Sequence, residues 1–177
     1  MKSRLVVIDM QVVFADPGTE WATPGFADIV PRVTSLVAAL SPAVTFTRFV
    51  APAEPVGAWR EYYARWPFAL QPPDAPLFDV VDAFDPGPTI DATTFSKWGP
   101  ELAAAVGTGT LVLAGVSTDC CVLSTAVAAA DAGVPVQVVA DACAGVDSAS
   151  HAQALHVMGL YGPLIEVVDT AAVLAER

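Results

Sequence analysis

Basic residues are scarce in this chain of 177 residues, which has 8 lysines and arginines against 19 aspartates and glutamates and a net charge of −11. Proteins bind phosphate backbones through lysine and arginine side chains, so this balance argues against a nucleic-acid partner. The same charge favours solubility in a chain whose residues are 54% hydrophobic. The charge balance therefore excludes one class of partner without indicating a substrate.

Cysteines are also few, and their number is odd: Cys120 and Cys121 are adjacent, and Cys143 stands apart. A disulfide framework needs more cysteines at wider spacing. Long apolar runs are missing, because runs such as 111–116 and 126–130 fall far short of the roughly 20 residues of a membrane span. The N-terminal segment lacks the pattern of a secretory leader. We expect a reduced, cytoplasmic protein that does not bind a membrane.

Apolar runs alternate with segments of helical periodicity along the chain. Strands are predicted at 5–8, 44–47, 89–94, 110–114, 134–139 and 164–168. Helices are predicted at 29–40, 59–66, 101–106, 118–132 and 148–160. This alternation implies a parallel sheet with helices on both faces. We predict one domain over residues 1–177, a three-layer α/β/α fold with a Rossmann-like open sheet of five or six parallel strands.

Three chemically capable side chains follow predicted strands, at the sheet edge where open α/β folds bind ligands. Asp9 ends the first strand, Lys97 follows the third, and Cys121 follows the fourth. A thiol nucleophile needs a base, which is usually histidine, but the two histidines lie late on a predicted helix. A carboxylate whose pKa is raised by burial can replace it. Asp9 is therefore the candidate base, and Lys97 a group that steadies the thiolate.

The segment from Gly115 to Val122 reads as a sharp turn into a helix, with Thr118 or Asp119 as the N-cap. Cys121 then lies in the first turn, where the helix N-terminus favours a thiolate and free N–H groups can hold an oxyanion. A cysteine near a helix start is, however, more often a small buried hydrophobe. On local chemistry alone both interpretations of Cys121 stay open.

Several segments, taken together and in order, resemble the motifs of the isochorismatase-like cysteine hydrolases. These segments are Val7–Phe14, Thr94–Lys97, Leu113–Val122, and Val138–Ala144 with the following His151. The resemblance spans nearly the whole chain and implies the isochorismatase-like fold with a catalytic triad of Asp9, Lys97 and Cys121. It also implies a cis peptide bond between Val116 and Ser117, and an oxyanion hole formed by the N–H groups of Ser117 and Cys121.

The family includes nicotinamidases, N-carbamoyl amide hydrolases, ureidoacrylate-type amidases and isochorismatases. Nicotinamidases carry histidine metal ligands after the second strand, whereas this chain has no histidine in Thr47–Pro52. The resemblance therefore implies no metal and no cofactor, and a site pattern like that of metal-free N-carbamoylsarcosine amidases. Because Cys121 is present, it favours hydrolysis of a small molecule's amide, ureide or carbamoyl C–N bond through a thioester. The alternatives are vinyl-ether hydrolysis of the isochorismatase type and a catalytically silent ligand-binding protein.

Four further residues are predicted to contact substrate. Gln11 and Phe14 follow Asp9, although Phe14 suits the core equally well. Arg48 suits a substrate carboxylate or a surface ion pair. Trp66 belongs to the irregular, proline-rich segment 49–88, whose aromatic residues suit a pocket wall, a lid or a subunit interface.

The remaining cysteines and histidines are interpreted as structural. Cys120 is expected to be buried against the sheet, and Cys143 to lie in the core. His151 and His156 are five residues apart and so do not share a helix face, which argues against a zinc pair, although one of them can pack near the site. The high apolar fraction leads us to expect a homo-oligomer, a dimer or tetramer.

Overall fold

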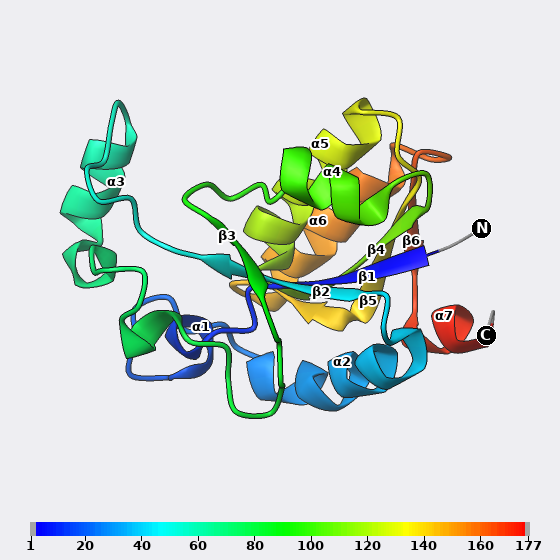
Figure 1. The fold of residues 1–177 in the computed structure, drawn as a ribbon, viewed down its shortest axis with the longest axis horizontal. Helices are drawn as coiled ribbons and strands as arrows, with labels where there is room; N and C mark the ends of the chain where they lie inside the picture. The colour runs from blue at the N-terminus through cyan, green and yellow to red at the C-terminus, as the bar shows by residue number, and fades with distance from the viewer. Residues whose placement is uncertain (1–2, 176–177) are drawn as a thin grey trace.

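Six parallel strands form one open sheet at the centre of the computed structural model, which describes residues 3–175 (Figure 1). The strands are β1 (Ser3–Ile8), β2 (Val44–Phe49), β3 (Thr89–Ala92), β4 (Thr110–Val116), β5 (Val136–Ala144) and β6 (Ile165–Val168). Their spatial order is β3-β2-β1-β4-β5-β6, and each neighbouring pair is parallel. The direction of winding reverses between β1 and β4, and open α/β sheets bind ligands beyond the strand ends at such a point. The predicted fold class is confirmed.

Helices cover both faces of the sheet (Figure 1). One face is covered by α2 (Phe26–Leu40) and α7 (Thr170–Ala175), and the other by α4 (Pro100–Val106), α5 (Leu123–Asp131) and α6 (Ser148–Gly159). The short helices α1 (Val12–Ala15) and α3 (Trp59–Arg65) lie beyond the carboxyl ends of the strands. Two 3₁₀ turns, Pro67–Ala69 and Pro76–Phe78, follow α3 in the chain. In the part of the chain that the structure describes, no helix is both long and apolar enough to cross a membrane.

Strand β1 shows why the central strands read as unbroken apolar runs. Its side chains alternate between the faces, so Leu5 and Val7 pack in the α2 core while Val6 and Ile8 pack in the α4–α6 core. All four are completely buried. A strand covered by helices on both faces has no polar side, and continuous hydrophobicity is the result.

The main differences from the predicted element boundaries lie at β5 and in the helix after β4. Strand β5 was expected to end at residue 139 but continues to Ala144, because the register shifts between Leu113 and Gly115 and the end of β4 pairs with Cys143 and Ala144. The helix expected over 118–132 begins with a π-helical turn, η3 (Thr118–Val122), and only then becomes α5. The short helices α1 and α7 and the 3₁₀ turns were not predicted, since elements of three to six residues are too short to show a period.

The irregular segment 49–88 folds around a small core of its own. Tyr63 of α3 and Phe78 are buried there with Val50, Ala51 and Ala69. This packing fixes the segment against the carboxyl edge of the sheet, where it supplies one wall of the site described below.

Candidate active site

Asp9 is fixed at the carboxyl end of β1 and is completely buried. Its φ of 50° lies in the left-handed region, which is uncommon for a residue other than glycine. Thr47 of β2 donates a hydrogen bond of 2.7 Å from Oγ1 to Oδ1 of Asp9, and the Asp9 N–H donates to the same hydroxyl at 3.3 Å. The neighbouring strand therefore holds one carboxylate oxygen and leaves the other for different contacts.

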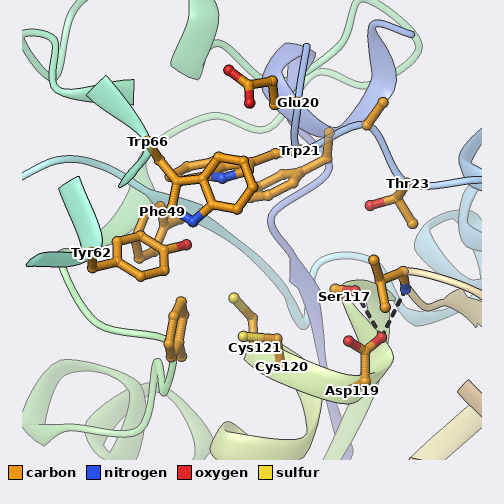
Figure 2. A pocket seen from close by; sticks show the side chains of 14 residues that line it. Glu20, Trp21, Thr23, Phe49, Tyr62, Trp66, Ser117, Asp119, Cys120 and Cys121 are labelled. Atoms are coloured by element: carbon orange, nitrogen blue, oxygen red, sulfur yellow. Dashed lines mark hydrogen bonds between the residues drawn. The ribbon is translucent and has the colours of Figure 1, made fainter. Parts of the chain in front are cut away.

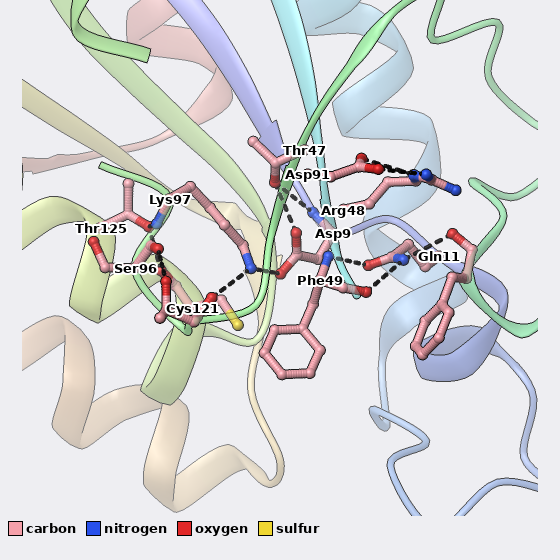
Figure 3. Close-up of polar contacts among 12 residues, drawn as sticks. Asp9, Gln11, Thr47, Arg48, Phe49, Asp91, Ser96, Lys97, Cys121 and Thr125 are labelled. Atoms are coloured by element: carbon pink, nitrogen blue, oxygen red, sulfur yellow. Dashed lines mark hydrogen bonds and ion pairs between the residues drawn. The ribbon is translucent and has the colours of Figure 1, made fainter. Parts of the chain in front are cut away.

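Lys97 is the ion-pair partner of Asp9 (Figure 3). Its Nζ lies 3.0 Å from Oδ2 of Asp9, and neither side chain is exposed to solvent. The same Nζ donates to the Thr94 carbonyl at 3.0 Å and lies 4.8 Å from the centre of the Phe49 ring. Besides the Lys97 ion pair, no hydrogen-bond donor within residues 3–175 is found for Oδ2, so this oxygen keeps a further acceptor position.

Cys121 lies in the π-helical turn η3, which follows β4 directly. Its carbonyl accepts a hydrogen bond of 2.7 Å from the Thr125 hydroxyl, and that hydroxyl accepts one of 2.9 Å from the Lys97 N–H. The Lys97 loop is thus tied to the helix that carries the cysteine. Figure 3 shows the Asp9, Lys97 and Cys121 side chains at the same edge of the sheet.

The start of η3 differs from the predicted helix cap. Ser117, rather than Thr118 or Asp119, occupies the N-cap position, and the peptide bond between Val116 and Ser117 is cis. Oδ1 of Asp119 accepts hydrogen bonds from Ser117 Oγ at 3.0 Å and from the Val146 N–H at 2.9 Å. Asp119 therefore joins the turn to the loop after β5 instead of capping the helix.

The two adjacent thiols have opposite pKa shifts. Hydrogen bonding to Cys120 raises the pKa of Cys121, and burial and the Asp9 carboxylate raise it further, while the Lys97 cation opposes them. The same hydrogen bonding lowers the pKa of Cys120. Cys121 is therefore a thiol at neutral pH and needs a base before it can attack.

The other cysteines and the histidines have different surroundings. Cys120 was expected to be buried against the sheet, but it is half-buried and lines a cavity beside Cys121, because the π-helical turn presents both residues to that side. Cys143 is buried, and desolvation raises its pKa to about 12, as suits a core thiol. His151 Nδ1 lies 2.8 Å from Thr118 Oγ1, next to the site, and His156 is exposed. Among residues 3–175 no three His, Cys, Asp or Glu side chains are grouped to hold a metal ion.

A cavity of about 240 Å³ opens onto the two cysteines (Figure 2). Six of its fourteen lining residues are aromatic. The lining residues are Phe14, Glu20, Trp21, Ala22, Thr23, Phe49, Tyr62, Trp66, Phe95, Ser117, Asp119, Cys120, Cys121 and Val146. Asp9 and Lys97 are not in this lining, and their side chains are completely buried.

Two of the four predicted substrate contacts, Phe14 and Trp66, line the cavity, and two do not. Gln11 is completely buried: Nε2 donates to the Phe49 carbonyl at 3.1 Å and to the Phe78 carbonyl at 2.8 Å, and Oε1 accepts from the Phe49 N–H at 2.8 Å. Arg48 forms a two-pronged ion pair with Asp91 of β3, with 2.9 Å between Nε and Oδ1. Gln11 and Arg48 therefore lie outside the cavity lining with backbone groups and a carboxylate as partners, and their contact with substrate stays a prediction.

Several lining residues were not predicted from the sequence. Trp21 is central to the aromatic wall: it stacks on Phe14 at 6.1 Å between ring centres and meets the edge of Trp66 at 6.5 Å. Glu20 and Trp21 come from an irregular stretch after α1, and Phe95 from the loop that carries Lys97. Loops have no periodicity, so no signal in the sequence pointed to Glu20 or Trp21. For Phe95 the only signal was its position two residues before Lys97.

A family model described as the isochorismatase domain matches residues 3–172. No curated protein sequence matches the chain significantly.

Solved structures share the fold at low identity. A cysteine hydrolase from Pseudomonas syringae pv. phaseolicola 1448A has a TM-score of 0.85 at 23% identity, covering 98% of this chain and 91% of that one. An isochorismatase family protein from Desulfovibrio vulgaris subsp. vulgaris str. Hildenborough has a TM-score of 0.85 at 24% identity, covering 99% of each chain. A pyrazinamidase of Pyrococcus horikoshii in complex with zinc has a TM-score of 0.75 at 24% identity, covering 96% of this chain and 99% of that one.

Proposed function

The chain belongs to the isochorismatase family of hydrolases, and we propose that it cleaves a non-peptide C–N bond of a small molecule through a thioester on Cys121. The bond would belong to an amide, ureide or carbamoyl group. One observation carries the proposal: Cys121 lines the cavity while the buried Asp9–Lys97 ion pair acts on its thiol from the protein side.

The first step is proton transfer from Cys121 to Asp9. Because the pKa of Cys121 is raised, the resting residue is a thiol, and attack requires a base. Oδ2 of Asp9 has an open acceptor position, and Lys97 compensates the negative charge that then develops on sulfur. The other oxygen stays on the Thr47 hydroxyl, which keeps the carboxyl group oriented.

The second step is attack of the thiolate on the carbonyl carbon. The negative charge that forms on the substrate oxygen is placed on the N–H groups of Ser117 and Cys121. Asp119 fixes the Ser117 side chain at the start of this turn. As the C–N bond breaks, Asp9 returns its proton to the leaving amine, and the acyl group stays on sulfur as a thioester. Water then attacks the thioester, Asp9 accepts its proton, and the acid and the free thiol are released.

The proposed steps use only the side chains and N–H groups of this chain. Lys97 supplies the fixed positive charge of the site, and it is shielded from solvent, where an electrostatic contribution is larger than in water.

The test is a release assay for ammonia or amine over a panel of small amides, ureides and carbamoyl compounds, with intact-mass detection of an acyl adduct on Cys121. We expect Cys121→Ala to abolish both turnover and adduct. Cys143→Ala is the matched control, because it removes a buried thiol outside the cavity, and it should keep both. Amide hydrolysis that survives in Cys121→Ala would overturn the mechanism. Vinyl-ether hydrolysis that survives there would favour the isochorismatase-type reaction, and a panel without any turnover would favour a ligand-binding protein.

A further inference from the structure

The charges that line the cavity are all negative. Among residues 3–175, Glu20 and Asp119 are the only carboxylates in the lining, which has no lysine, arginine or histidine. Arg48, which the sequence offered as a carboxylate ligand, is paired with Asp91 outside the lining. A substrate carboxylate entering this cavity would meet two like charges and no cation, and like-charge contacts disfavour binding.

The aromatic wall favours the opposite charge. Trp21, Tyr62 and Trp66 lie close together, with Trp21 5.8 Å from Tyr62 and 6.5 Å from Trp66 between ring centres. Ring faces attract cations through their quadrupole, most strongly in tryptophan, and groups of such rings bind alkylated ammonium ions. Burial raises the pKa of Tyr62, so its hydroxyl stays neutral and adds no charge of its own. Arg65 stacks on the Trp66 ring at 5.3 Å but does not line the cavity.

The two acids lie at different ends of the cavity. Figure 2 shows Glu20 beyond Trp21 and Trp66, on the side away from the cysteines, whereas Asp119 lies next to them. Asp119 is held by Ser117 and Val146 through Oδ1, which leaves Oδ2 for a donor on the reacting amide. Glu20 is exposed at the far side. The net charge of −11 on the whole chain attracts cations to the protein in general.

We propose that this cavity selects substrates whose non-reacting end carries a permanent positive charge, such as a quaternary ammonium group. The carbonyl carbon lies at Cys121, and the cationic end lies among Trp21, Trp66 and Glu20. This substrate class rests on the proposed amide hydrolysis, although binding of the cation does not require turnover.

Three amides of equal chain length test the charge preference. They are γ-trimethylammoniobutyramide, its neutral isostere with a tert-butyl group in place of trimethylammonium, and glutaramate. The charged group is three methylenes from the carbonyl, so the reactivity of the amide is similar in all three. We expect kcat/KM for the cation to exceed that of the neutral isostere about tenfold, and glutaramate to be the poorest substrate.

Two variants test whether the charge preference arises at the end of the cavity that holds Glu20 and Trp66. Glu20→Gln and Trp66→Leu should each lower the cation-to-neutral ratio of kcat/KM several-fold, because one removes the charge and the other a ring face. Glu166→Gln is the matched control, since it removes an exposed carboxylate from β6 outside the cavity lining, and the ratio should not change. Added salt should also lower the ratio, as expected for an exposed charge.

Calorimetric binding of the three compounds to Cys121→Ala separates this inference from the proposed reaction. Tighter binding of the cation, with no turnover of these compounds or of the wider amide, ureide and carbamoyl panel, would uphold the charge preference and overturn the hydrolase proposal. Equal or tighter binding of the neutral isostere or of glutaramate would overturn the charge preference, whatever the enzyme hydrolyses. If Glu20→Gln and Trp66→Leu left the cation-to-neutral ratio of kcat/KM unchanged, the placement of the cationic group at this end of the cavity would be overturned.

Discussion

Lys97 Nζ lies 3.0 Å from Oδ2 of Asp9, and solvent reaches neither side chain. A buried ion pair is expensive to desolvate, and it contributes little to stability compared with a well-packed apolar pair. Its position therefore suggests a chemical purpose: a carboxylate with an open acceptor position, next to a thiol whose pKa it helps to raise. Four predictions follow the consequences of this arrangement and of the packing around it.

Asp9→Asn should separate turnover from thiol acidity. Loss of the base should lower kcat/KM about a hundredfold to ten-thousandfold. Because the Asp9 carboxylate raises the pKa of Cys121, its removal should lower that pKa and make the thiol easier to alkylate at neutral pH. Iodoacetamide labelling across pH, read at Cys121 by peptide mass spectrometry, measures this alongside the activity. Asp85→Asn, at an exposed site, is the control. A loss of activity together with a raised or unchanged thiol pKa would argue against a base.

Cys120→Ala should shift the pKa of Cys121 downwards. Hydrogen bonding to Cys120 is the largest cause of the raised pKa, so the alkylation curve of Cys121 should move to lower pH once the neighbouring thiol is gone. In an isolated thiol pair whose neighbour stabilises the thiolate, removing that neighbour would raise the pKa. The change expected here has the opposite sign. Cys143→Ala should leave the curve in place. A shift to higher pH in Cys120→Ala would show that Cys120 favours the thiolate at Cys121.

Gly115→Ala should destabilise the protein strongly. Gly115 has a φ of +115°, and a Cβ there would lie 2.1 Å from the Ile8 carbonyl oxygen, so β1 and β4 would have to separate next to Asp9. We expect a loss of about 3 kcal/mol or more in the free energy of unfolding, measured by urea denaturation. Gly159→Ala is the matched control: it is the last residue of α6 with no atom within 4 Å of the added carbon, and should change stability by less than about 1 kcal/mol.

Gln11→Leu should cost stability while leaving substrate affinity largely intact. The change leaves the Phe49 N–H and the Phe49 and Phe78 carbonyls without their buried partner. Each unsatisfied buried group costs about 1–3 kcal/mol, so urea denaturation should show a loss of several kcal/mol. Gln71→Leu, which removes one exposed hydrogen bond, is the control. A raised KM with unchanged stability would instead return Gln11 to the substrate site.

The arrangement of the sheet was predictable because its determinants are local. Strand β1 is apolar throughout because both its faces are covered, and a strand of that kind can be recognised from its own residues. Glycines and prolines at the ends of the helical segments limited the remaining elements to within a few residues. The boundaries that failed, at β5 and η3, depend on the register against β4 and on a π-helical turn, and neither leaves a local period.

The order of the motifs also placed Asp9, Lys97 and Cys121 at one sheet edge, because residues that follow parallel strands come together there. The partners of the polar side chains were beyond reach of the sequence. Gln11 is taken by backbone groups 38 and 67 residues away, and Arg48 by a carboxylate 43 residues away.

The sequence by itself determined the α/β sheet, the family and the three candidate catalytic residues, since these follow from hydrophobic pattern and from motifs that are continuous in the chain. Only the tertiary structure decided what the cavity offers a substrate. Glu20 and Trp21 lie in one loop, Trp66 in a second and Phe95 in a third. Their combined negative charge and aromatic surface exist only once packing has brought those loops together.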